Sequence, residues 1–187
     1  MTEKDEGKLQ EILYSDVAME LKRMRDADQT MRVRAMAREG CIFTDEEKAL
    51  DERHTERMKE IVGQIGWPSI SKVGKDGAQF AWLLVQHADH APEFQVHCLH
   101  MMRELPEGDI KPWQIAYLED RVNVNTGKPQ RYGTQFWEDP PNGLVPRPIE
   151  DIEHLDERRR AIGLESFAEY KTLLHEKYKI KEDAKKH

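Results

Sequence analysis

The stretch DGAQFAWLLVQHADH, residues 76–90, decides the fold that the sequence predicts. Residues 78–85 are apolar except at one glutamine, and they tolerate a helix interior. Four polar side chains follow directly: Gln86, His87, Asp89 and His90. An apolar helix has to be buried, whereas polar groups at its end need partners or a ligand. The stretch therefore predicts the central helix of a helical domain, with its polar end opening into a pocket.

The composition of the 187-residue chain fits one domain of this kind. Charged residues make up 35% of the chain, but the apolar residues recur in periodic runs, which argues against a disordered protein. We expect a single domain over residues 1–187, with disordered tails at residues 1–6 and 181–187. The net charge of −7 argues against nucleic acid or an anionic membrane as the main partner.

The cysteines and the N-terminal residues bear on the compartment. Cys41 and Cys98 are too few for a disulfide framework, and Cys98 lies on an apolar helix stripe. No apolar segment follows the charged start, and no run approaches the ~18 apolar residues of a membrane span. We therefore expect a cytoplasmic protein. We expect its partner to be a small molecule or a peptide. The sequence leaves its oligomeric state open.

Two helices are predicted before the central one. Residues 7–38 carry apolar side chains at three- and four-residue spacing, which is typical of an amphipathic helix. A capping-box pattern at Thr44 and Glu47 begins the second helix, and glycines end it. We expect Trp67 to anchor the following turn to the core and Asp76 to cap the central helix.

Further helices are predicted after the central one. Pro92 and Pro112 mark the starts of two of them, because proline suits the first turn of a helix. The alternation VNVN then predicts a short β-hairpin or extended segment near residues 120–137, with residues 125–129 as its loop. Two final helices are expected at residues 150–162 and 166–180. The predicted fold class is therefore mainly α, with little strand.

The polar end of the central helix is the first candidate site. On an ideal helix Gln86, Asp89 and His90 fall on one side, and His87 lies nearer the other. A histidine can move a proton at neutral pH, and a nearby aspartate can fix its tautomer. We therefore predict that His87, His90 and Asp89 are catalytic. The alternative is structural: a histidine braces the next helix, and Asp89 caps that helix before Pro92.

A second polar group begins at Asp120 and Arg121. Arg121 and Lys128 can bind a carboxylate or a phosphate, although the order of residues in a P-loop is absent. Neutral side chains that can donate and accept hydrogen bonds follow: Gln130, Tyr132, Thr134 and Gln135. The alternative for this group is a solvated hairpin with glycines at its turns.

A third group is Asp28, Gln29 and Arg32. Asp28 and Arg32 are four residues apart and can pair on one helix face, which is the usual structural role of that spacing.

A metal site is an alternative to metal-free chemistry. His87 and His90 can share an ion, with further ligands from residues 151–154. The chain has no HExxH, no paired ExxH helices and no CxxC. We therefore predict no metal ligand set and no other cofactor.

Five sequence motifs are spread along the chain. They are GWPS, VG, AWLLVQHADH, AYLEDRV and GKPQRYGTQ. In their order and spacing the chain resembles a family of bacterial domains of unknown function. The resemblance covers residues 9–175 and implies a helical domain, but no reaction. It also implies that the three polar groups are signature positions. His54 departs from the resemblance, which has a smaller amide there. We expect the three groups to line one pocket.

These observations lead to a hypothesis of a small cytosolic enzyme with a histidine acid/base pocket. It would act on a small polar molecule or a peptide, by hydrolysis or by elimination or cyclisation. Arg32, Arg121 and Lys128 would hold an anionic group. Other residues would orient the substrate: Asp28, Gln29, Gln86, Asp120, Gln130, Tyr132, Thr134 and Gln135. The alternatives are a non-catalytic module that binds a ligand or peptide, and a metalloprotein.

Overall fold

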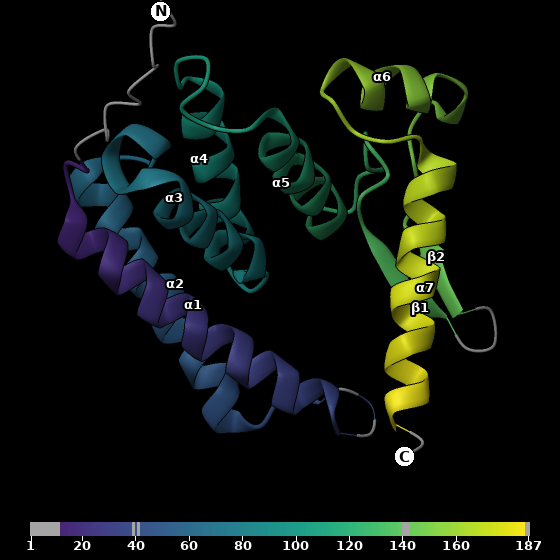
Figure 1. The fold of residues 1–187 in the computed structure, drawn as a ribbon, viewed down its shortest axis with the longest axis horizontal. Helices are drawn as coiled ribbons and strands as arrows, with labels where there is room; N and C mark the ends of the chain where they lie inside the picture. Colours follow the sequence, from purple (N-terminus) through teal and green to yellow (C-terminus); the bar gives the residue numbers. More distant parts are fainter. Residues whose placement is uncertain (1–11, 39, 41, 140–142, 186–187) are drawn as a thin grey trace, which may run out of the picture.

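The computed structural model describes residues 12–38, 40, 42–139 and 143–185, with side chains up to residue 177. The described part is mainly helical, with seven α-helices and one two-stranded hairpin (Figure 1). The helices are α1 Ser15–Met36, α2 Asp45–Ile65, α3 Ile70–His87, α4 Pro92–Arg103, α5 Pro112–Asn125, α6 Leu155–Ala161 and α7 Phe167–Lys185. The predicted fold class is confirmed.

Helix α3 is the centre of the fold, as its apolar sequence predicts. It contacts α1, α2, α4 and α5, and in Figure 1 these helices gather around it. Ala81 and Val85 are fully buried. Trp82 is also buried; its Nε1 donates a hydrogen bond to the carbonyl of Gln114 at 2.9 Å, and its ring meets that of Trp113 edge-on. The indole thus joins α3 to α5 through both an apolar and a polar contact.

Local signals placed most helix ends correctly. The capping box at Thr44 is present: its side chain accepts from the Glu47 N–H, and the Glu47 carboxylate accepts from the Thr44 N–H. Pro92 and Pro112 begin α4 and α5. Trp67 is 1% exposed, which confirms that it anchors the turn between α2 and α3.

The start of α3 differs from the prediction. The helix begins at Ile70, and its backbone breaks at Gly74, where φ is 74° and ψ is 171°. Asp76 therefore lies inside the first turn after the break, and the prediction that it caps the helix is wrong. The positive φ at Gly74 marks the break, because residues other than glycine rarely adopt that backbone conformation.

The predicted hairpin or extended segment near residues 120–137, with its loop at residues 125–129, begins later in the chain than expected. Helix α5 continues to Asn125, and the chain turns at Gly127. Leu118 and Val122, four residues apart on one face of α5, are buried, so packing of α5 on the core outweighs the short VNVN alternation. The hairpin lies later, where β1 (Phe136–Asp139) pairs antiparallel with β2 (Gly143–Pro146).

The C-terminal part packs on the hairpin rather than on α3. A short 3₁₀ helix, η2 (Ile152–His154), leads into α6, and α7 contacts both α6 and β2. Helix α7 continues to Lys185, so it includes most of residues 181–187, which we expected to be a disordered tail. The chain has no glycine or proline between residues 167 and 185 to end the helix. The expected tail at residues 1–6 lies outside the described residues.

Two glycines test the close packing of α3. A Cβ at Gly77 would lie 2.9 Å from the Cβ of Val73, whereas a Cβ at Gly63 in α2 would meet nothing within 4 Å. We expect Gly77→Ala to lower the free energy of unfolding by about 1–3 kcal/mol through overpacking. Gly63→Ala should raise it by about 0.5–1 kcal/mol, because alanine favours the helix. Urea unfolding of both variants measures the difference; equal effects would contradict this account of α3.

Candidate functional site

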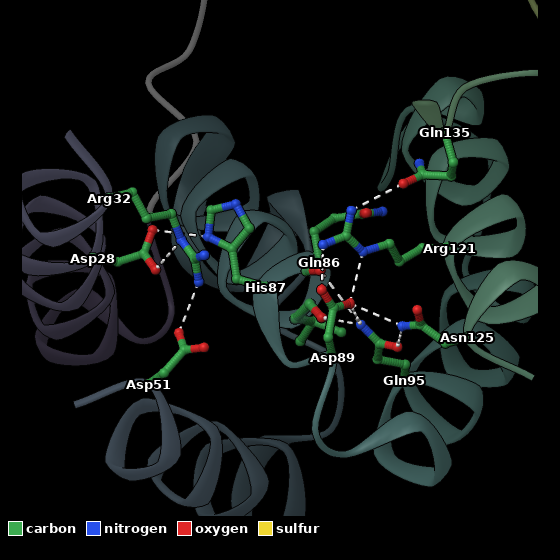
Figure 2. Close-up of polar contacts among 11 residues, drawn as sticks. Asp28, Arg32, Asp51, Gln86, His87, Asp89, Gln95, Arg121, Asn125 and Gln135 are labelled. Atoms are coloured by element: carbon green, nitrogen blue, oxygen red, sulfur yellow. Dashed lines mark hydrogen bonds and ion pairs between the residues drawn. The ribbon is translucent and has the colours of Figure 1, made fainter. Parts of the chain in front are cut away.

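His87, the last residue of α3, contacts a buried aspartate on α1. Its Nδ1 lies 2.8 Å from Oδ2 of Asp28, 59 residues earlier in the chain (Figure 2). Asp28 is fully buried, and the His87 side chain is 18% exposed. Arg32 donates from Nε to the other oxygen of Asp28 at 2.8 Å, and Gln29 donates to Oδ2 at 2.9 Å. The carboxylate therefore orients the imidazole and leaves its Nε2 without a protein partner among the described residues.

The charges around Asp28 keep it ionised. Burial by itself would raise the pKa of Asp28, but the hydrogen bond with His87 and the charges of His87 and Arg32 lower it below its usual range. Arg32 also donates from Nη2 to Asp51 on α2 at 2.7 Å. Burial and the negative charge of Asp28 raise the pKa of Asp51, against the opposing charge of Arg32. One guanidinium thus links two carboxylates whose pKa values shift in opposite directions.

Two more histidines lie near these carboxylates. Burial lowers the pKa of His54, whose Nδ1 is buried without a hydrogen-bond partner in the described part of the chain. His90 is exposed, and its charge acts on the pKa of Asp51. No hydrogen bond between His87 and His90 is found among the described residues, so the two predicted catalytic histidines differ in burial and in partners.

A second network lies on the other side of the end of α3. Arg121 on α5 pairs with both oxygens of Asp89, through Nε at 2.7 Å and through Nη2. Asn125 donates to Asp89 at 2.8 Å and to Gln95 at 2.9 Å. Gln135 accepts from Nη1 of Arg121 at 3.0 Å. Asp89 therefore pairs with arginine rather than histidine, and it does not cap α4, whose N-cap is Ala91.

Electrostatics match this pairing. Partial burial of Asp89, whose side chain is 46% exposed, would by itself raise its pKa, but the hydrogen bond and charge of Arg121 lower it. The predicted role of Asp89, orientation of a histidine, falls to Asp28 instead.

Most of the remaining predicted residues hold a loop in place. Asp120 is fully buried and accepts the backbone N–H groups of residues 131, 132 and 134, as well as the hydroxyl of Thr134. Burial raises the pKa of Asp120, although these hydrogen bonds oppose the shift. The Gln130 amide donates to the carbonyls of Gln135 and Arg147 and accepts the Gln135 N–H. Asp120, Gln130 and Thr134 thus use their polar atoms inside the fold.

Tyr132 and Lys128 form no hydrogen bond with His87 among the described residues. Tyr132 belongs to the loop that Asp120 holds, and its carbonyl accepts from Nη1 of the buried Arg159 at 2.6 Å. Lys128 is exposed in the turn after α5.

The predicted residues therefore form two networks and a braced loop rather than one ring of side chains. Figure 2 shows the Asp28 and Asp89 networks on opposite sides of the end of α3, with the side chain of Gln86 beside Arg121. The prediction missed Asp51, Gln95 and Asn125. An i, i+3 pair of Asp51 and His54 on α2 was the only sequence signal for the first of these, and it resembles an ordinary solvated face.

Metal ligation has no geometric support in the part of the chain that the structure describes. There, no three His, Cys, Asp or Glu side chains are grouped so that they could hold an ion. Asp151 and His154, considered as extra ligands, bond each other at 2.8 Å on the surface.

A family model matches residues 15–183, nearly the whole chain. The chain belongs to the Family of unknown function (DUF6624). No curated protein and no solved structure matches it. Membership in the family agrees with the resemblance found in the sequence and assigns no reaction. Among the described helices of this family member, none combines the length and the apolar character needed to cross a membrane.

Asp28→Asn tests whether the first network is held by charge. We expect a loss of about 3 kcal/mol in the free energy of unfolding at pH 7, because a buried ion pair loses one partner. The pKa of Asp28 is lower in the folded protein than in the unfolded chain. The stabilisation that its carboxylate provides is therefore complete above the ordinary pKa of 3.8, and it is lost as the pH falls through the lowered pKa of the folded state. Denaturant unfolding at several pH values measures it.

Asp26→Asn is the matched control. Asp26 is exposed on the same helix and pairs with Lys22, so its replacement should not change stability measurably. Equal effects of the two substitutions would contradict the importance of the buried carboxylate.

Proposed function

We propose that the protein is an enzyme in which His87 is the general acid and base. The observation that carries the proposal is the 2.8 Å contact between Nδ1 of His87 and the buried, ionised Asp28. A carboxylate that accepts from Nδ1–H fixes the imidazole in one tautomer and leaves Nε2 free to take a proton. The side chain is only partly buried, so a substrate could reach Nε2.

The remaining polar residues differ in whether they are available to bind a substrate. Arg32 and Arg121 each already pair with carboxylates, so we assign neither to an anionic substrate group. Lys128 remains available for that role. Asp51, with its raised pKa, can share a proton with a bound substrate, and His90 lies where its charge affects Asp51. We propose hydrolysis, or elimination or cyclisation, of a small polar molecule or peptide, without a metal or other cofactor.

The proposal extends to the location of the protein, its partners and the signature of its family. We propose a cytoplasmic protein that binds neither nucleic acid nor membranes, because its net charge of −7 repels both. We also propose that the strings QHADH and YGTQ are part of the signature of the family, and that its members are bacterial.

The tautomer of His87 can be measured without a known substrate. We expect ¹⁵N NMR at about pH 8, where an ordinary histidine is neutral, to show the proton of His87 on Nδ1. In Asp28→Asn the preference should weaken, since the amide of asparagine can donate to Nδ1 as well as accept from it, whereas a carboxylate only accepts. His100, exposed on α4, is the internal control and should show no comparable preference. A proton on Nε2 of His87 in the wild-type protein would contradict the proposal.

His87→Ala tests the catalytic role directly. A panel of ester, amide and peptide substrates, followed for turnover, should identify one that the wild-type protein converts. We expect His87→Ala to lower that rate by about 100-fold or more, which is typical for loss of a general acid and base. His100→Ala is the control and should keep the wild-type rate. A wild-type rate in folded His87→Ala would remove the catalytic role, and protection by a ligand without turnover would identify a non-catalytic binding module.

A further inference from the structure

Gln86 is buried at the polar end of α3 with an unused amide. The residue is 6% exposed, and its Nε2 is buried without a hydrogen-bond partner in the described part of the structure. Its backbone carbonyl, by contrast, accepts from the side chain of Gln95 at 3.4 Å. A buried donor that is left unpaired lowers stability, and in native proteins it commonly marks a site for water or a ligand.

The amide and carboxylate side chains near Gln86 already have hydrogen-bond partners. Gln95 is fully buried and bonds the carbonyl of Val85 at 3.0 Å, as well as Asn125. Asp89 and Gln135 both bond Arg121. Figure 2 shows the side chain of Gln86 beside Arg121, on the Asp89 side of the helix end. The open hydrogen-bonding capacity is therefore a property of Gln86 itself and not of loose packing at this end of the helix.

We infer that Gln86 binds a carboxamide of the substrate, either a peptide group or a primary amide. A glutamine side chain offers one acceptor and an N–H donor in one plane, and a carboxamide offers the complementary pair. A neutral group also suits the charges: Arg121 and Arg32 are each bound to carboxylates, so no cation beside Gln86 is left to neutralise an anion. The inference rests on the proposed function, because the substrate on which His87 acts would carry the carboxamide that Gln86 holds on the neighbouring side of the helix end.

A purely structural glutamine would behave differently when replaced. If Gln86 has no partner in the free protein, Gln86→Leu removes an unpaired polar group and keeps most of the volume. We expect the Tm of the free protein to stay unchanged or to rise by about 2–4 °C. Gln95→Leu, the same substitution at a buried and fully bonded amide, is the matched control and should lower the Tm.

Binding is tested with N-acetylglycinamide, a minimal peptide, and with acetate and inorganic phosphate as anionic probes. In ¹H–¹⁵N NMR titrations of the full chain, the peptide probe should shift the side-chain NH₂ signals of Gln86 and saturate, whereas the anions should not. We expect Gln86→Leu to weaken peptide binding at least tenfold and His87→Ala to retain it.

Three results would overturn the inference. They are a Tm loss in Gln86→Leu as large as that in Gln95→Leu, equal affinity for acetate and the peptide probe, and no saturable binding of the peptide probe. The outcome is separable from that of the proposed function. Peptide binding that depends on Gln86, together with undiminished turnover in His87→Ala, would disprove only the catalytic role of His87. Loss of turnover in His87→Ala without peptide binding at Gln86 would disprove only the carboxamide site.

Discussion

Burial of α3 imposes the constraint on which the rest of the structure depends. Its apolar length is removed from water, and the buried or half-buried polar groups at its C-terminal end then need hydrogen-bond partners. His87 meets that requirement on the side of α1, through the carboxylate of Asp28, and Asp89 meets it on the side of α5, through Arg121. The helices packed around α3 are thus held by ion pairs at one end and by apolar contacts along their length.

The two networks flank the same helix end, but they differ in how completely their polar groups are hydrogen-bonded. Around Asp89 nearly every group is bonded, so that network fixes how α4 and α5 meet α3. Around Asp28 the pairing is less complete, because Nε2 of His87 and Nδ1 of His54 lack partners among the described residues. Nε2 of Gln86, at the same helix end, is also without a partner in the part of the chain that the structure describes. Groups with open hydrogen-bonding capacity are those that can serve a substrate, and in the described part of this region they belong to His87, His54 and Gln86.

Sequence patterns predicted the helices well where the signals were local. The capping box at Thr44 and the prolines at the starts of α4 and α5 act within a few residues, so tertiary contacts seldom override them. The VNVN alternation failed because it is short, and because Val122 continues a buried helical stripe. For the site, sequence identified His87 and Gln86 but paired His87 with the wrong aspartate. Asp89 is near in sequence, whereas Asp28 approaches only when α1 packs on α3.

By itself, the sequence determined a helical protein with one apolar helix at its centre and a polar group at the end of that helix, since periodicity and composition act locally along the chain. Only the tertiary structure decided which polar residues became partners. It used Asp120 and Gln130 to hold a loop, joined Arg32 to two carboxylates, and left His87 Nε2 and Gln86 Nε2 without partners among the described residues. The physical reason is that a charged or amide side chain has many possible partners in sequence, and burial selects among them by distance alone.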